Sequence, residues 1–122
     1  MRKEASDRTP AVELNTEEGF LSLEGKSVME DAHAFYSELM DLLDQYLQTE
    51  GAKLEYRFRL SYFNTSSSKY FLDMVRAGER SPAGAKGRVS AIWMYEPEDL
   101  DMKEAGQDYK ALTDIKFEIK AV

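Results

Sequence analysis

Strict alternation of apolar and polar side chains from Leu54 to Tyr62 constrains the fold more than any other feature of the sequence. The apolar members of the run are Leu54, Tyr56, Phe58, Leu60 and Tyr62. The polar members are Glu55, Arg57, Arg59 and Ser61. Because successive side chains of a strand point to opposite faces, the run predicts a β-strand with one face in a core and one polar face.

Helical periodicity lies on both sides of this strand. Before it, apolar residues recur at three- and four-residue steps at Ala32, Phe35, Tyr36, Leu39, Leu43, Tyr46 and Leu47. Ser27 and Glu30 have the spacing of a capping box, so a long helix is predicted to begin there and to stop at Gly51. After the strand, similar spacing predicts a second helix through Tyr70, Phe71, Met74 and Val75 and a short third one through Met102, Ala105, Tyr109 and Leu112.

The remaining segments complete one α/β domain. Residues 11–14 and 20–24 predict a β-hairpin, and residues 88–95 and 115–121 predict two further strands. Residues 1–8 are expected to form a disordered tail, and residues 77–87, rich in Gly and Pro, a mobile loop. The expected order over residues 9–122 is ββαβαβαβ, a single layered domain with a mixed sheet and helices packed mainly on one face.

Composition excludes several classes of function. The 122 residues fit one domain, and the absence of cysteine excludes disulfides, thiolate metal sites and cysteine nucleophiles. A formal net charge of −7 disfavours nucleic acid and anionic membrane surfaces, and no apolar run is long enough for a signal peptide or a membrane span. We therefore expect a cytoplasmic protein with a protein partner, no nucleic acid, no membrane insertion and no cofactor.

Two features could support catalysis, and neither matches a known pattern. His33 is the lone histidine and has no second ligand type beside it, so a surface or boundary position is the simpler interpretation. Residues 96–104 are acidic, but counting from Asp99 places Lys103 where an EF-hand loop needs an oxygen ligand. A solvated helix start explains this acidic loop, and no metal site is predicted. A carboxylate enzyme that uses a divalent metal at this loop remains the alternative hypothesis, and a passive scaffold domain is a third.

Consecutive hydroxyl side chains mark the corner between the clearest strand and the second helix. Asn64 is followed by Thr65, Ser66, Ser67 and Ser68, and then by Lys69. Capping of the helix explains one or two of these polar residues. The free N–H groups and partial positive charge of a helix start would also accommodate a phosphate, which could act as a switch. Physical reasoning alone leaves both interpretations open.

Three separated motifs give the sequence a resemblance to a known family. They are Gly25-Lys26-Ser27 with Glu30 and Phe35-Tyr36, then Tyr62 to Lys69, and finally Trp93 to Glu96 with Asp99, Asp101-Met102 and Glu104 to Tyr109. From about Thr9 to the C-terminus the chain resembles the SiaC-type regulatory phosphoproteins of bacteria. Its corner also resembles that of anti-sigma-factor antagonists, which are phosphorylated at a helix start.

The resemblance implies a partner-switching function without catalytic activity. It implies that Thr65 is phosphorylated by a cognate serine/threonine-type protein kinase and dephosphorylated by a metal-dependent protein phosphatase. The unphosphorylated form would bind and activate a diguanylate cyclase, in c-di-GMP signalling and biofilm regulation. Asn64, Ser66, Ser67, Ser68 and Lys69 are then the neighbours of the switch. The candidate partner-binding residues are Tyr62, Tyr70, Glu98, Asp99 and Asp101.

Overall fold

A computed structural model describes all residues from Met1 to Val122 and contains one six-stranded sheet. The strands follow sequence order across the sheet: β1 (Arg2–Lys3), β2 (Ala11–Asn15), β3 (Phe20–Ser27), β4 (Leu54–Phe63), β5 (Val89–Tyr95) and β6 (Lys116–Ala121). The first two pairings are antiparallel and the other three are parallel. The predicted mixed sheet is confirmed.

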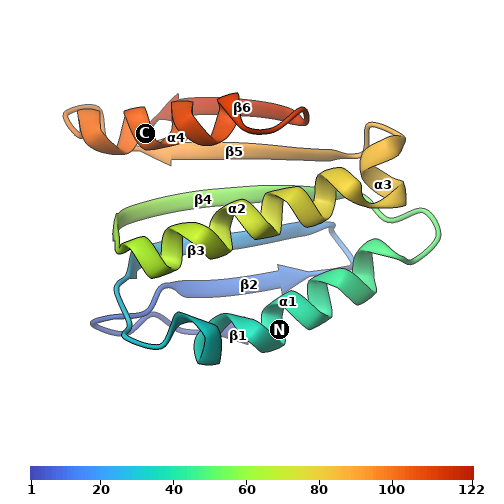
Figure 1. Ribbon diagram of the computed structural model, residues 1–122, viewed down its shortest axis with the longest axis horizontal. Helices are drawn as coiled ribbons and strands as arrows, with labels where there is room; N and C mark the ends of the chain where they lie inside the picture. Colours follow the sequence, from blue (N-terminus) through green and yellow to red (C-terminus); the bar gives the residue numbers. More distant parts are fainter.

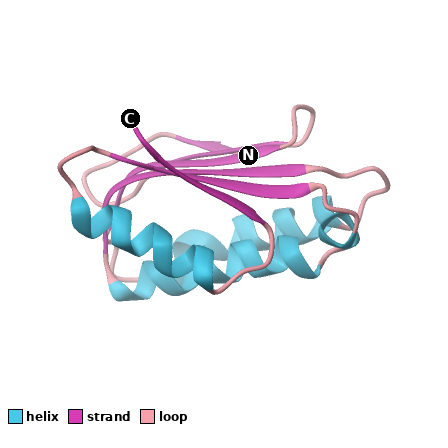
Figure 2. Cartoon of the chain, turned by 90° about the horizontal axis from the view of Figure 1, so that it is seen from above, coloured by secondary structure: helices cyan, strands magenta, loops and turns pink.

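Helices cover one face of this sheet. They are α1 (Ala32–Leu47), α2 (Thr65–Arg80), the single turn α3 (Pro82–Ala85) and α4 (Leu100–Ala111). Figure 1 shows the three long helices side by side in front of the strands, and Figure 2 shows the opposite face of the sheet uncovered. Each long helix connects two parallel strands, so all three begin at the same end of the sheet, where the carboxyl ends of β3, β4 and β5 lie.

The core fills the space between the sheet and the helices. Leu39 of α1 and Phe58 of β4, each on the apolar stripe of its element, are both 1% exposed. Trp93 of β5 is buried to the same degree, and its Nε1–H donates to the carbonyl of Met102 at 2.9 Å. Gly106 makes this close packing possible, because a Cβ at that position would collide with the Trp93 ring. The start of α4 is therefore fixed against β5.

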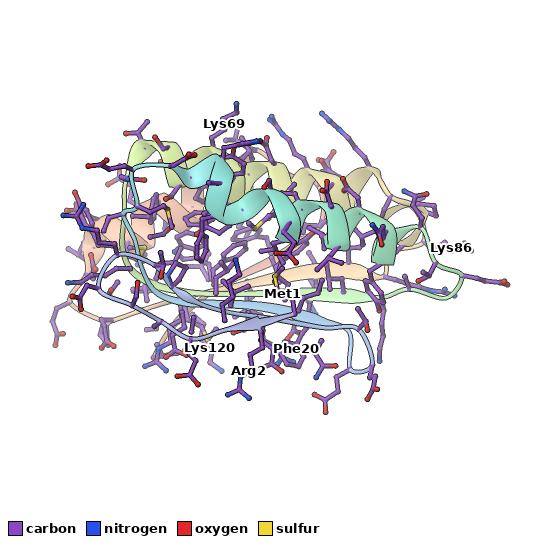
Figure 3. All side chains as sticks on the ribbon, turned by 90° about the horizontal axis from the view of Figure 1, so that it is seen from below. Met1, Arg2, Phe20, Lys69, Lys86 and Lys120 are labelled. Carbon is purple, nitrogen blue, oxygen red and sulfur yellow. The ribbon has the colours of Figure 1, made fainter.

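Charged side chains line the uncovered face, as the alternation in β4 predicts. The Arg57 guanidinium lies 4.1 Å from the centre of the Phe20 ring, and its Nε donates to Glu55 at 2.7 Å. Figure 3 shows Arg2, Phe20 and Lys120 on this side of the sheet, whereas Lys69 points outward beyond the helices. The arginines of β4 thus form part of a solvated sheet face with mixed charge.

The structure corrects two predictions at the ends of the first sheet elements. Residues 1–8 do not form a disordered tail, because Arg2 and Lys3 pair with β2 as an edge strand and Val28 donates its N–H to the carbonyl of Arg8 at 2.9 Å. Backbone pairing orders this segment although it has no apolar run, and Met1 packs against the core. Ser27 does not cap α1, because it ends β3 and is buried, and Asp31 caps the helix instead.

A third correction concerns residues 77–87, which are not a loop throughout. The second helix continues to Arg80, and Ser81 then caps α3 by accepting a hydrogen bond from the N–H of Gly84 at 3.1 Å. Pro82 occupies the first turn of α3, where a residue without an N–H is tolerated. Gly78 packs in the second helix against Tyr56. The residues that suggested a loop are therefore used for helix packing and capping.

Candidate functional site

Asn64 organises the corner at which β4 becomes α2. Its Oδ1 accepts the N–H of Ser67 at 2.9 Å, which is the usual N-cap bond. Its Nδ2 donates to the carbonyl of Met29 at 3.0 Å, and its own N–H donates to the carbonyl of Ser27 at 3.1 Å. The corner is thereby tied to the segment between β3 and α1. Capping needs only Asn64 and leaves the Thr65 hydroxyl free for another purpose.

A buried hydrogen-bond network lies directly beneath this corner. The Ser67 hydroxyl donates to the carbonyl of Ser27 at 2.9 Å, and the Ser27 hydroxyl donates to Ser67 Oγ at 2.7 Å. Both serine protons are then used, so Tyr36, whose hydroxyl lies 2.6 Å from Ser27 Oγ, must be the donor in that contact. Burial raises the pKa of Tyr36 to about 12, against a smaller lowering by the Ser27 hydrogen bond. The Tyr36 phenol therefore stays protonated at neutral pH and can donate to Ser27.

The hydroxyls of the corner have different environments. Ser67 is buried, and Ser68 donates its hydroxyl to the carbonyl of Thr65 at 2.6 Å. Thr65 and Ser66 are exposed, and neither side chain makes a hydrogen bond within the chain. Thr65 is also the first residue of the helix, so its amide and that of Ser66 lack intrahelical acceptors. Two hydroxyls of the run are thus available to an enzyme, and Thr65 lies closest to the helix end.

The surroundings of Thr65 favour an added anion. The free N–H groups of the first turn carry partial positive charge, which stabilises an anion by roughly 0.3 to 1 kcal/mol at an exposed position. Lys69 follows Thr65 by four residues and lies on the same side of the helix, and its ammonium makes no ion pair within the chain. A phosphate on Thr65 would therefore meet N–H donors and a cation without displacing any contact of the fold.

A groove opens beside the corner on the side of α4. Tyr62 and Phe63 of β4 line it together with Asp99, Asp101 and Met102, and its volume is about 210 Å³. Tyr62 is 62% exposed, whereas Asp99 caps α4 by accepting the N–H of Met102 at 3.1 Å. Three of the five residues predicted to bind a partner, namely Tyr62, Asp99 and Asp101, thus lie together at one surface.

The other two predicted partner-binding residues lie elsewhere. Tyr70 is on the α1 side of α2, where its ring stacks on Tyr36 at 5.5 Å and its hydroxyl lies 3.0 Å from Nδ1 of His33. Glu98 is exposed in the turn before α4 and does not line the groove. His33 is therefore an exposed residue at the contact between two helices. The groove is lined by Tyr62 and Phe63, which precede Thr65 in the chain, and it includes neither Thr65 itself nor Tyr70.

Comparison with known proteins identifies the family. The sequence model of the SiaC family regulatory phosphoproteins matches residues 3–122. This chain belongs to the SiaC family. Its structure resembles apo-SiaC from Pseudomonas aeruginosa with a TM-score of 0.91 and 28% sequence identity, over 99% of this chain and 98% of that chain.

A second solved structure shows a SiaC protein with its partner. It is the diguanylate cyclase SiaD in complex with its activator SiaC from Pseudomonas aeruginosa, with a TM-score of 0.93 and 28% identity, over 100% of this chain and 99% of that chain. The uncharacterized protein PA14_02130 of strain UCBPP-PA14 is also 28% identical over 113 residues, which cover 93% of this chain and 89% of that protein. The family resemblance seen in the sequence is confirmed.

In this SiaC family chain, the acidic segment before α4 stabilises the start of that helix. Asp99 is the cap, and Asp101 in the first turn complements the positive helix end. Within the chain, no three His, Asp and Glu side chains lie close enough together to hold one metal ion. None of the helices has the length and apolar character needed to cross a membrane.

Sequence reasoning missed two members of the site, Ser27 and Tyr36. Ser27 looked like a helix cap and Tyr36 like an ordinary core residue, and neither interpretation links them to the second helix. One signal in the sequence could have found Ser27, namely its place in the family motif Gly25-Lys26-Ser27. A helix cap alone does not require a preceding Gly-Lys pair, so this motif indicates a further role for Ser27. Gly25 has φ of +113°, the register of β3 on β4 shifts after it, and the strand continues to Ser27.

Proposed function

We propose that this protein is a non-catalytic signalling protein whose unphosphorylated form binds and activates a diguanylate cyclase. Thr65 is the acceptor of a reversible phosphate, which a cognate serine/threonine-type kinase adds and a metal-dependent phosphatase removes. The output of the switch is c-di-GMP signalling and biofilm regulation. Support comes from membership of the SiaC family and from the activator role of SiaC in its complex with SiaD.

The observation that carries the proposal is the state of the Thr65 hydroxyl. It is exposed and unbonded at the first position of α2, whereas Ser67 and Ser68 use their hydroxyls within the fold. Ser66 is also free but lies one residue further into the helix. A kinase that reads this corner therefore finds in Thr65 an acceptor whose modification disturbs no existing hydrogen bond.

The charge of the phosphate explains how binding would be switched. A phosphate carries a charge of about −1.5 to −2 at neutral pH. Tyr62 and Phe63, which line the acidic groove, precede Thr65 by three and two residues, so the proposed partner surface continues toward the modified residue along the chain. A dianion carried into an interface that fits a neutral hydroxyl loses water without gaining a counter-charge from the partner, which costs several kcal/mol. A loss of 3 kcal/mol weakens binding roughly a hundredfold.

Two measurements test the proposal. Coexpression with the cognate kinase should add the mass of one phosphate to the wild type and to Ser66→Ala, and none to Thr65→Ala. Titration of the cyclase should give equal affinities for the wild type and Thr65→Ala, about hundredfold weaker binding for the phosphorylated protein and an intermediate loss for Thr65→Asp. Equal affinities for all four proteins, with unchanged melting curves, would refute the switch. Phosphate on Thr65→Ala would place the acceptor elsewhere.

A further inference from the structure

The last strand of the sheet has a free edge along its whole length. β6 pairs with β5 on one side, and no strand pairs with it on the other. Figure 2 looks onto this edge and shows β6 crossing in front of the other strands with nothing drawn over it. The opposite edge of the sheet is β1, which has two residues. Short edge strands resist pairing with another chain, so β6 is the edge that matters.

The hydrogen bonds between β6 and β5 determine which backbone groups of β6 point to the free edge. The N–H of Val122 donates to the carbonyl of Tyr95 on β5 at 2.9 Å. Since backbone groups of a strand alternate between its two sides, the N–H and C=O of Phe117, Ile119 and Ala121 point to the free edge. These groups can form an antiparallel ladder with a second strand.

The charges of β6 alternate along the uncovered sheet face. Lys116, Glu118 and Lys120 are exposed, whereas Phe117 and Ile119 pack toward the helices. An edge that is only protected against pairing would carry charges of one sign, because like charges placed opposite each other repel. Glu118 between the two lysines breaks that arrangement. The strand therefore carries both a negative and a positive side chain, which can pair with the opposite charges of an antiparallel second copy of β6.

We propose that β6 pairs antiparallel with β6 of a second copy of this chain, around a two-fold axis at Ile119. A two-fold interface uses the same surface on both subunits and therefore requires a self-complementary pattern. With Ile119 opposite its own copy, Glu118 lies opposite Lys120 of the second copy twice, and Phe117 lies opposite Ala121. Every rung falls within β6. The register centred on Glu118 would instead oppose like charges.

Packing and size set the expected strength of this pairing. Ile119 is only half-buried in the single chain, and contact with its own copy would cover it further. The contact of one strand pair is smaller than the roughly 1,200 to 2,000 Å² of stable interfaces. The dimer should therefore be weak, with a dissociation constant of micromolar or above, and it would join two sheets into one continuous sheet.

Analytical ultracentrifugation of the whole chain at concentrations from roughly 10 µM to 1 mM covers the range in which a dimer of this strength would form and dissociate. The wild type should rise from the mass of one chain toward that of two. Glu118→Lys gives three lysines on each edge and should weaken association at least tenfold. The triple variant Lys116→Glu/Glu118→Lys/Lys120→Glu restores alternation and should restore association, although it makes the chain more negative overall. Ala121→Pro removes an outward N–H at an exposed position and should also weaken association.

The results separate this proposal from a general charge effect. Each variant is first checked for wild-type melting, because all substituted side chains except Ala121 are charged and exposed. A wild type that stays at the mass of one chain over the whole range overturns the proposal. Association that is unchanged in Glu118→Lys, or that fails to return in the triple variant, overturns it as well, since either result places the contact on another surface.

Discussion

Tyr109 of α4 donates its hydroxyl proton to the backbone carbonyl of Ser68 in α2, and the two oxygen atoms lie 2.9 Å apart. The bond links the groove side of α4 to the first turns of the helix that carries Thr65. Burial raises the pKa of Tyr109 above its ordinary value. The phenol is therefore protonated and able to donate at neutral pH.

Tyr109→Phe removes this donor and keeps the ring on Trp93, whose centroid lies 5.1 Å away. We expect a loss of about 0.5 to 1.5 kcal/mol in the free energy of unfolding, the usual net contribution of one hydrogen bond. Urea denaturation with an unchanged m-value measures it. Tyr109→Leu is a more disruptive comparison that also loses the aromatic packing, and a phenylalanine variant as unstable as the leucine variant would contradict a role for the hydroxyl alone.

Asn64 and Thr65 should differ sharply in their effects on stability, although they are adjacent. Asn64→Ala removes the cap bond to Ser67 and the bond to Met29, and should cost about 1 to 2 kcal/mol. Thr65→Ala removes an exposed hydroxyl without a partner and should change stability by less than about 0.5 kcal/mol. Thermal melts compare the two directly. Asn64→Asp keeps the cap acceptor but loses the Nδ2 donor, so its melting temperature should fall between them.

Tyr36 should make stability fall at high pH. Its pKa is about 12 in the folded chain, compared with the ordinary value of 10.0. Below pH 10 both states keep the proton and the contribution is fully present. As the pH rises from 10 to 12 the unfolded chain ionises first, so up to about 2.7 kcal/mol of stability is lost. Unfolding of Tyr36→Phe, measured against pH, should show a shallower decline than wild type in this window and a parallel course between pH 7 and 9.

Tyr62 should contribute to partner binding without contributing to the fold. Its exposed ring at the mouth of the groove is the kind of aromatic side chain that dominates interfaces, so Tyr62→Ala should weaken cyclase binding at least tenfold. Leu112→Ala is the matched control, because Leu112 is also a large apolar residue, 52% exposed, but lies just beyond the far end of α4. Calorimetric titration that gives both variants the same affinity would argue against the groove as the docking surface.

Periodicity in the sequence predicts most of the fold because each element has one apolar side. The strand through Phe58 and the helix through Leu39 follow from residues that repeat at two-residue or helical steps, and both side chains are buried. Two segments escape this reasoning because interactions outside any periodic apolar pattern determine them. Arg2 and Lys3 pair with β2 through their main chain, and Gly78 stays helical because it packs tightly on Tyr56.

The sequence places Thr65 at the start of the second helix, where the structure has it, and its role as phosphate acceptor stays a prediction. The residues that support this corner from below were not predicted. The run of hydroxyls locates the corner, but which of them are free depends on Ser27 and Tyr36, which are distant in sequence. No local pattern reports a contact between residues 40 positions apart, such as Ser27 and Ser67. The groove is likewise formed by β4 and α4, which only the topology of the sheet brings together.

The rigid setting of Thr65 limits how an enzyme can recognise it. Thr65 is part of a capped helix whose start is held by the hydrogen bonds of Ser67 and Asn64 to the segment before α1, so the chain around it is not free to extend into a cleft. Recognition of a linear motif is therefore poorly suited to this residue. A kinase or phosphatase acting here has to fit the folded corner as a shape, and a short peptide with the same sequence would lack the surface that identifies it.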